Sequence, residues 1–215
     1  MLARTDTRPT VLLTSFGPFP GIPVNASAGL VRKVGRLARR AFPGFRFTSS
    51  VLPTEWRRAP ARIAALHGRY RPALALHFGV AAGGNSIRLE TRAENVCRAS
   101  PDAAGLLPLA ATLCSDGPAE RRVTIDVSAV SNALQRRGFP TSISDDAGSY
   151  LCNAVLYYSL ASGEAKNAAV GFVHIPADVS DSQLTTEKLA AAALEIINVA
   201  LREIRQPADT EAKRS

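Results

Sequence analysis

Short apolar stretches that alternate with amphipathic segments constrain the fold of this chain more than any other feature of its sequence. The stretches over 10–16, 73–79 and 168–174 are apolar along almost their whole length, which is typical of strands buried on both faces. Between the first two, apolar residues such as Leu30 and Val31 recur every three or four positions, as in a helix with one buried face. Strands and helices that alternate in this way predict a three-layer α/β/α sandwich around a largely parallel, twisted sheet.

The same pattern predicts a single domain over residues 1–206 and a polar tail over 207–215 that we expect to be disordered. Strands are expected at 10–16, 45–52, 73–79, 87–96, 141–144 and 168–174. Helices are expected from a cap at Asn25 or Ser27 to Ala41, and at 55–70, 126–137, 149–162 and 185–204. The stretch from 97 to 120 has little periodicity, and a long irregular excursion of this kind is often functional or part of a lid.

Composition excludes several classes of protein. The formal net charge is +8, but the arginines are spread over helical segments without interleaved aromatic residues, which favours a solvated surface over a nucleic-acid interface. No apolar run approaches the roughly 18 residues of a membrane span, and the first ten residues lack the apolar segment of a signal peptide. The three cysteines, Cys97, Cys114 and Cys152, are scattered and odd in number, which predicts a reducing, cytoplasmic location without a disulfide framework.

The sequence contains no motif for binding a nucleotide cofactor or a metal ion. The glycine-rich segment 79–86 lacks both the P-loop lysine and the G-x-G-x-x-G spacing, so we expect no nucleotide cofactor. No G-x-S-x-G turn is present, which argues against a serine hydrolase. His67, His77 and His174 are not spaced as metal ligands, and we expect no metal site.

Cys152 is a candidate nucleophile because of its predicted position. A β-prone segment ends in a polar turn at Gly148, and a helical pattern begins at about Ser149, so the cysteine falls in the first turn of a helix. The free N–H groups and the dipole of a helix start are expected to lower a thiol's pKa and to favour the thiolate. The alternative is an inert cysteine buried in the core.

His174 is a candidate general base, since it is a polar residue close to the end of an apolar strand. The alternative is a structural histidine whose hydrogen bonds are satisfied by its neighbours. A cysteine–histidine pair needs a third group to orient the imidazole, and both Glu90 and Asp178 are available for this role. In parallel sheets the site lies beyond the carboxyl ends of the strands, where segments 16–19 and 79–84 are also expected.

Four segments resemble those of a known family, the pyroglutamyl peptidases, which are cysteine peptidases with an α/β/α fold. The most specific is S-x-D-A-G-x-Y-L-C-N over 144–153, which is similar to the nucleophile signature of that family. The segment G-F-V-H-I-P over 171–176 resembles the one that carries the catalytic histidine, and 79–95 the one that carries the catalytic glutamate. The segment F-G-P-F-P-G with V-N-x-S over 16–27 resembles the N-terminal motif. The resemblance spans about residues 10–200.

The resemblance implies a role for individual residues. It makes Cys152 the nucleophile, His174 the general base and later acid, and Glu90 the residue that orients the imidazole. Further residues would bind the pyrrolidone ring or line its pocket: Phe16, Phe19, Asn25, Val80 and Leu151. The implied activity is that of a cysteine exopeptidase that cleaves after an N-terminal pyroglutamyl residue of a peptide through a thioester acyl-enzyme, with no cofactor. The resemblance leaves a homo-oligomeric state open.

The chain departs from the family pattern at a few positions. Val80 replaces a polar pocket residue, and Thr91-Arg92 stands where the family has Arg-Val, so that an arginine is moved or lost. Arg98 is a candidate for another family arginine that precedes a Pro-Asp pair. These departures indicate a divergent member and leave two alternatives, which are a thiol amidohydrolase acting on a different cyclic or acylated amine and a binding protein that keeps the pocket without turnover.

Overall fold

The computed structural model describes residues 6–82, 84–164, 167–177 and 184–205. They form a six-stranded sheet in the order β2-β1-β3-β8-β4-β7 and a separate two-stranded sheet, β5-β6. The strands are β1 (Thr10–Phe16), β2 (Arg46–Leu52), β3 (Leu74–Ala81), β4 (Ile87–Glu90), β5 (Arg92–Glu94), β6 (Glu120–Arg122), β7 (Thr141–Ser144) and β8 (Ala169–Pro176). The helices are α1 (Ala26–Ala41), α2 (Arg58–Tyr70), α3 (Val127–Arg136), α4 (Leu151–Glu164) and α5 (Thr186–Arg205).

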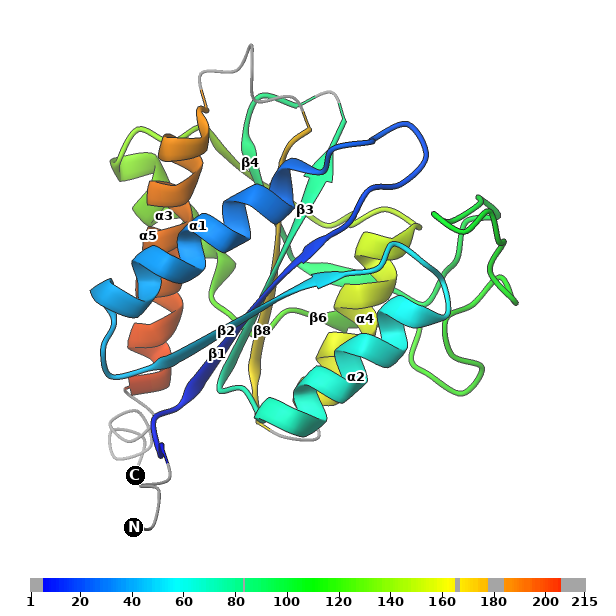
Figure 1. Cartoon of the computed structure of the whole chain (residues 1–215), viewed down its shortest axis with the longest axis horizontal. Helices are drawn as coiled ribbons and strands as arrows, with labels where there is room; N and C mark the ends of the chain where they lie inside the picture. The colour runs from blue at the N-terminus through cyan, green and yellow to red at the C-terminus, as the bar shows by residue number, and fades with distance from the viewer. Residues whose placement is uncertain (1–5, 83, 165–166, 178–183, 206–215) are drawn as a thin grey trace.

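Helices cover both faces of the large sheet, which confirms the predicted three-layer architecture (Figure 1). Helices α1, α3 and α5 lie on one face, and α2 and α4 on the other. Successive side chains of β1 point to opposite faces of the sheet, and both faces are covered. Val11 and Leu13 pack toward α1 and α5, whereas Leu12 and Phe16 pack toward α2 and α4, so β1 is apolar on both faces. None of the described helices is both long and apolar enough to span a membrane.

The direction of the strands determines where a site can form. Strands β1, β2, β3 and β8 are parallel to one another, whereas β4 pairs antiparallel with β8 and β7 runs parallel to β4. The sheet is therefore largely parallel, as predicted. Because β4 runs against β8, its first residues lie beside the carboxyl end of β8, with Arg88 opposite His174 and Glu90 opposite Phe172.

The prediction of one strand over 87–96 is wrong. The strand in the large sheet ends at Glu90. Residues Arg92–Glu94 form β5, which pairs with β6 in the two-stranded sheet instead. The buried side chain of Asn153, at the start of α4, accepts from the Glu94 N–H at 2.8 Å and donates to the Glu94 carbonyl at 2.8 Å. These side-chain hydrogen bonds hold the segment against α4, so that it does not continue β4 in the large sheet.

The irregular excursion is held on the α2–α4 layer by side-chain hydrogen bonds to its backbone. Trp56 Nε1 donates to the Ser100 carbonyl at 2.9 Å, and the Tyr157 hydroxyl donates to the Pro118 carbonyl at 2.8 Å. The buried Asp102 carboxylate accepts three backbone N–H groups, and these hydrogen bonds lower its pKa against the opposing effect of burial. The expected lack of regular structure between 97 and 119 is confirmed, and a lid function stays a prediction.

The domain limits drawn from the sequence, 1–206 and 207–215, stay a prediction, and the tail lies outside the described residues.

Two histidines that the sequence analysis set aside form a buried polar network between the sheet and the α2–α4 layer. His77 Nδ1 and Thr14 Oγ1 are 2.6 Å apart, and His77 Nε2 lies 2.7 Å from Ser159 Oγ. His67 Nε2 is bonded to the same serine hydroxyl at 2.9 Å. Burial, together with the neighbouring His67, lowers the pKa of His77 to about 3.

This network is expected to make the protein sensitive to acid. Above pH 6.5 His77 is neutral in both states, whereas below it the unfolded chain binds a proton that the folded chain accepts only near pH 3. The contribution of His77 to stability is therefore lost as the pH falls, by at most about 1.4 kcal/mol per pH unit. We expect His77→Asn to be less stable at pH 7 but to lose less stability between pH 6.5 and 4. Urea unfolding at several pH values measures this, and equal slopes for the variant and the parent would contradict it.

Candidate active site

A small cavity opens at the carboxyl ends of the central strands, with about 240 Å³ of empty space including its mouth. It is lined by Phe16, Phe19, Asn25, Thr54, Val80, Tyr150, Leu151 and Cys152. The five residues that the sequence analysis expected around a substrate ring therefore lie together, and the candidate nucleophile lies among them. The space between these side chains is small, so an occupant is limited to one small group.

The wall that carries Phe16 and Phe19 is fixed by hydrogen bonds to one carbonyl. The Asn25 side-chain amide donates to the Gly17 carbonyl at 3.1 Å, and Thr54 Oγ1 donates to the same oxygen at 3.1 Å. Asn25 also caps α1, since its side-chain oxygen accepts from the Ser27 N–H, so of the two predicted caps the first is the one used. The turn after β1 is thus tied to both α1 and the segment after β2.

Tyr150, which the sequence analysis missed, also lines the cavity, and Trp56 packs against it. Tyr150 lies 6.1 Å from Phe19 between ring centroids and meets Trp56 edge-on at 5.1 Å. Its hydroxyl donates to the Pro101 carbonyl at 2.9 Å, and the Arg98 guanidinium lies 5.7 Å from its ring. Its position two residues before Cys152 was the sequence signal that could have predicted Tyr150 as a cavity residue. Trp56 could not be found in this way, because its closeness to Tyr150 depends on how α2 packs.

Cys152 is the second residue of α4, which confirms its predicted place in the first turn of a helix. The thiol lies against β3, where a Cβ added to Gly79 would be 3.0 Å from Sγ and 2.9 Å from Phe172 Cζ. Any side chain at this position would push the thiol or the ring aside. The glycine thus lets the nucleophile lie directly against the sheet.

The expectation of a lowered thiol pKa is wrong. Burial and the negative charge of Glu90 together raise the pKa of Cys152 to about 12, against the opposing effect of the Arg88 guanidinium. Desolvation by the surrounding core outweighs the helix start. The resting residue is therefore a neutral thiol, and a base must take its proton during attack on a substrate.

His174 and Glu90 form the pair that such a base requires. His174 Nδ1 donates to Glu90 Oε1 at 2.6 Å, and both side chains are almost fully buried. On β4, Ile87 and Leu89 belong to the α1–α3–α5 core, so Glu90 points to the opposite face, toward α4. Asp178, the other predicted orienting residue, lies outside the described residues.

Arg88 is a component of the site that the sequence analysis did not predict. Its Nε donates to Glu90 Oε1 at 2.8 Å, and its Nη2 lies 3.4 Å from His174 Nδ1. Arg92, the arginine noted at a shifted position in the motif, is instead paired with Glu94 and Glu120. Residue alternation on an antiparallel β4 was the signal that could have identified Arg88.

The geometry supports nucleophilic acyl transfer. It combines a thiol at the wall of a small cavity with an imidazole oriented by a buried carboxylate. In the described part of the chain, no group of three or more His, Cys, Asp and Glu side chains could hold a metal ion.

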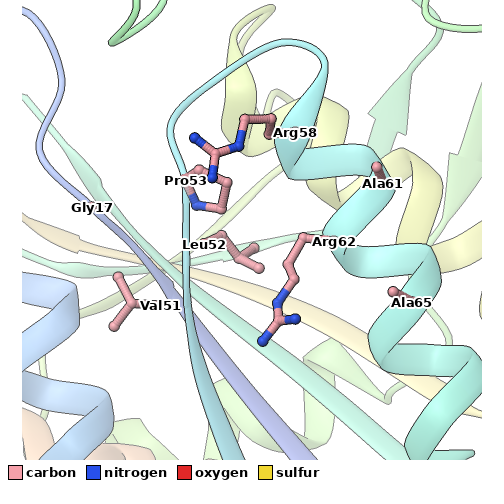
Figure 2. Close-up of a pocket in the computed structure, with 8 residues that line it drawn as sticks. All are labelled: Gly17, Val51, Leu52, Pro53, Arg58, Ala61, Arg62 and Ala65. Carbon is pink, nitrogen blue, oxygen red and sulfur yellow. The ribbon is translucent and has the colours of Figure 1, made fainter.

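A larger groove lies outside this site, between the end of β2 and α2 (Figure 2). Its lining residues are Gly17, Val51, Leu52, Pro53, Arg58, Ala61, Arg62 and Ala65. No nucleophile or acid–base group is among them, so the chemistry belongs to the cavity at Cys152.

Comparison with known proteins agrees with the geometry. A family model described as pyroglutamyl peptidase matches residues 9–208. A pyrrolidone-carboxylate peptidase of Chromobacterium violaceum is 35% identical over 168 residues, which cover 78% of this chain and 77% of that protein. One of Cupriavidus taiwanensis is 36% identical over 177 residues, covering 78% of each chain.

Solved structures give the same result. A mutant pyrrolidone carboxyl peptidase from Pyrococcus furiosus superposes with a TM-score of 0.82 at 28% identity, covering 91% of this chain and 99% of the other. Pyroglutamyl peptidase I of Bacillus amyloliquefaciens gives a TM-score of 0.80 at 25% identity, covering 91% and 98% of the two chains.

Proposed function

Because this chain belongs to the pyroglutamyl peptidase family, whose members are cysteine-type peptidases, we propose that it removes pyroglutamate from the amino terminus of peptides with Cys152, His174 and Glu90 as its catalytic residues. The observation that carries the proposal is the Glu90–His174 hydrogen bond of 2.6 Å, on the sheet face that also meets Cys152. A buried carboxylate bound to one imidazole nitrogen orients the ring for acid–base work.

The cavity binds the flat pyrrolidone ring mainly by apolar contact. Phe16 and Phe19 provide aromatic surfaces, and Val80 and Leu151 complete the wall. Asn25 and Thr54 hold the Gly17 carbonyl, so their part is to fix the shape of the pocket. The small volume favours a single ring residue and leaves the rest of the peptide outside.

The reaction begins as Cys152 Sγ attacks the carbonyl carbon that joins the pyroglutamyl residue to the next amine. Since His174 Nδ1 is bonded to Glu90, Nε2 is the nitrogen left to take the thiol proton. The same proton passes to the leaving amine as the tetrahedral intermediate collapses to a thioester. Water, deprotonated by His174, then releases pyroglutamate and restores the thiol. Main-chain N–H groups at the start of α4 stabilise the oxyanion, by about 3–4 kcal/mol per donor in comparable sites.

The test is release of aminomethylcoumarin from its pyroglutamyl derivative, with the prolyl and cyclopentanecarbonyl derivatives as controls. We expect turnover of the first substrate only. Turnover of cyclopentanecarbonyl but not pyroglutamyl amide would instead favour the thiol amidohydrolase, which the apolar Val80 in the cavity motivates. Absence of all turnover would favour a pocket-retaining binding protein. Slow alkylation of Cys152 would not separate these alternatives, because burial raises its pKa in any case.

The proposal extends to location and partners. Cys97, Cys114 and Cys152 are all free thiols, which supports a cytoplasmic location. A pyroglutamyl-terminated peptide is the proposed partner, without nucleic acid or membrane, and the homo-oligomeric state stays open.

A further inference from the structure

Arg88 stands in the site without a role in the chemistry described so far. Its side chain is 38% exposed and comes from the face of β4 that carries Glu90. It contacts the triad at two points, through the 2.8 Å bond from Nε to Glu90 Oε1 and the 3.4 Å approach of Nη2 to His174 Nδ1.

The orienting carboxylate is held by one oxygen. Glu90 Oε1 accepts from both His174 and Arg88, while Oε2 is buried without a hydrogen-bond partner among the described residues. Without Arg88, a carboxylate that is fully buried would keep a single hydrogen bond, and its direction would be fixed by packing alone. Arg88 therefore supplies the second contact that sets the orientation of Glu90.

The charge of Arg88 acts on the thiol as well. The charged groups that affect Cys152 on α4 are Glu90 and Arg88, both on β4, and they act in opposite directions. On β8, His174 faces the same two side chains, and on β3 the nearest residue is the uncharged Gly79. Among these groups, only the guanidinium carries a permanent positive charge.

We propose that Arg88 is a positioning residue of this site, which holds the Glu90 carboxylate toward His174 and places a permanent positive charge on the sheet face that meets Cys152. The inference rests on the proposed function, because it takes Cys152 as the reacting thiol.

The experiment compares Arg88→Met and Arg88→Lys in a background with Cys97→Ser and Cys114→Ser, where Cys152 is the remaining thiol. Alkylation by iodoacetamide is followed at pH 8, and kcat and KM for pyroglutamyl-aminomethylcoumarin are measured at the same pH. In Arg88→Met we expect alkylation to slow roughly 3- to 10-fold and kcat to fall by a similar factor with KM nearly unchanged. Arg88→Lys keeps the charge and should recover most of both effects.

Arg137→Met is the matched control, since it removes an arginine whose ion pair with Glu195 is on the other layer of the sandwich. It should change neither readout. An unchanged kcat and alkylation rate in Arg88→Met would overturn the proposal. An equal loss of kcat in both Arg88 variants, with the alkylation rate unchanged, would also overturn it by showing a structural role. If the parent does not turn over the pyroglutamyl substrate, the proposed function fails, while alkylation alone still decides the role of Arg88.

Discussion

Cys152→Ala is expected to abolish hydrolysis of pyroglutamyl-aminomethylcoumarin, lowering kcat by at least about 10³-fold. The substitution removes the sulfur that would form the acyl-enzyme, and no other thiol lines the cavity. The alanine fits where the cysteine was, because it only removes an atom that lies against Gly79 and Phe172. Near-UV circular dichroism and the urea midpoint should therefore stay close to those of the parent while turnover is lost.

The control for this experiment is the double variant Cys97→Ser and Cys114→Ser. Cys97 is half-buried and Cys114 is exposed, and neither lines the candidate cavity. We expect this variant to retain most of the parental kcat. If it lost turnover while Cys152→Ala retained it, the nucleophile would have been assigned to the wrong cysteine.

Glu90→Gln is expected to lower kcat by up to about 10⁴-fold with KM nearly unchanged, since the same change in the orienting carboxylate of a serine protease triad lowers kcat about 10⁴-fold. The amide carries no negative charge to stabilise the imidazolium that forms during attack. It can also present N–H rather than oxygen to His174 Nδ1, which would favour the wrong tautomer. KM should change little because Glu90 does not line the cavity.

Glu164→Gln serves as the matched control, since its carboxylate pairs with Arg121 at the exposed end of α4. It should leave kcat at the parental value. A near-parental rate in Glu90→Gln, together with an intact fold by circular dichroism, would move the orienting role to another acid. Asp178 would then be the first residue to test, as Asp178→Asn in the same assay.

The sequence alone was sufficient to predict the layers of this protein and most of the residues that line its pocket. The apolar runs and helical periodicities are local, and each indicates the burial of its own segment. Short motifs determine their own turns in the same way, as where Asn25 caps α1 and where Cys152 falls in the first turn of α4. Because parallel strands bring their carboxyl ends to one edge, these local assignments already brought Phe16, Val80 and Leu151 to one cavity.

The interruption between β4 and β5 at Thr91 could not be predicted from the alternation of apolar and polar residues. The residues from 92 to 94 have the same local pattern as β4. Their backbone, however, is hydrogen-bonded at Glu94 by the side chain of Asn153, which lies 59 residues further along the chain in α4. Only the packed structure brings the two segments together.

The electrostatics of the site likewise required the tertiary structure. A helix start favours the thiolate in isolation, but burial of Cys152 raises its pKa, an effect that depends on every element packed against it. Glu90 and His174 are 84 residues apart in the sequence. The antiparallel pairing of β4 with β8 places Arg88 beside both of them. The sequence thus determined most of the helices and strands, because these follow from local periodicity, and the resemblance of its motifs to a family indicated five of the residues that line the pocket. Protonation states and charge partners were decided by the tertiary structure, since they depend on burial and on contacts between distant segments.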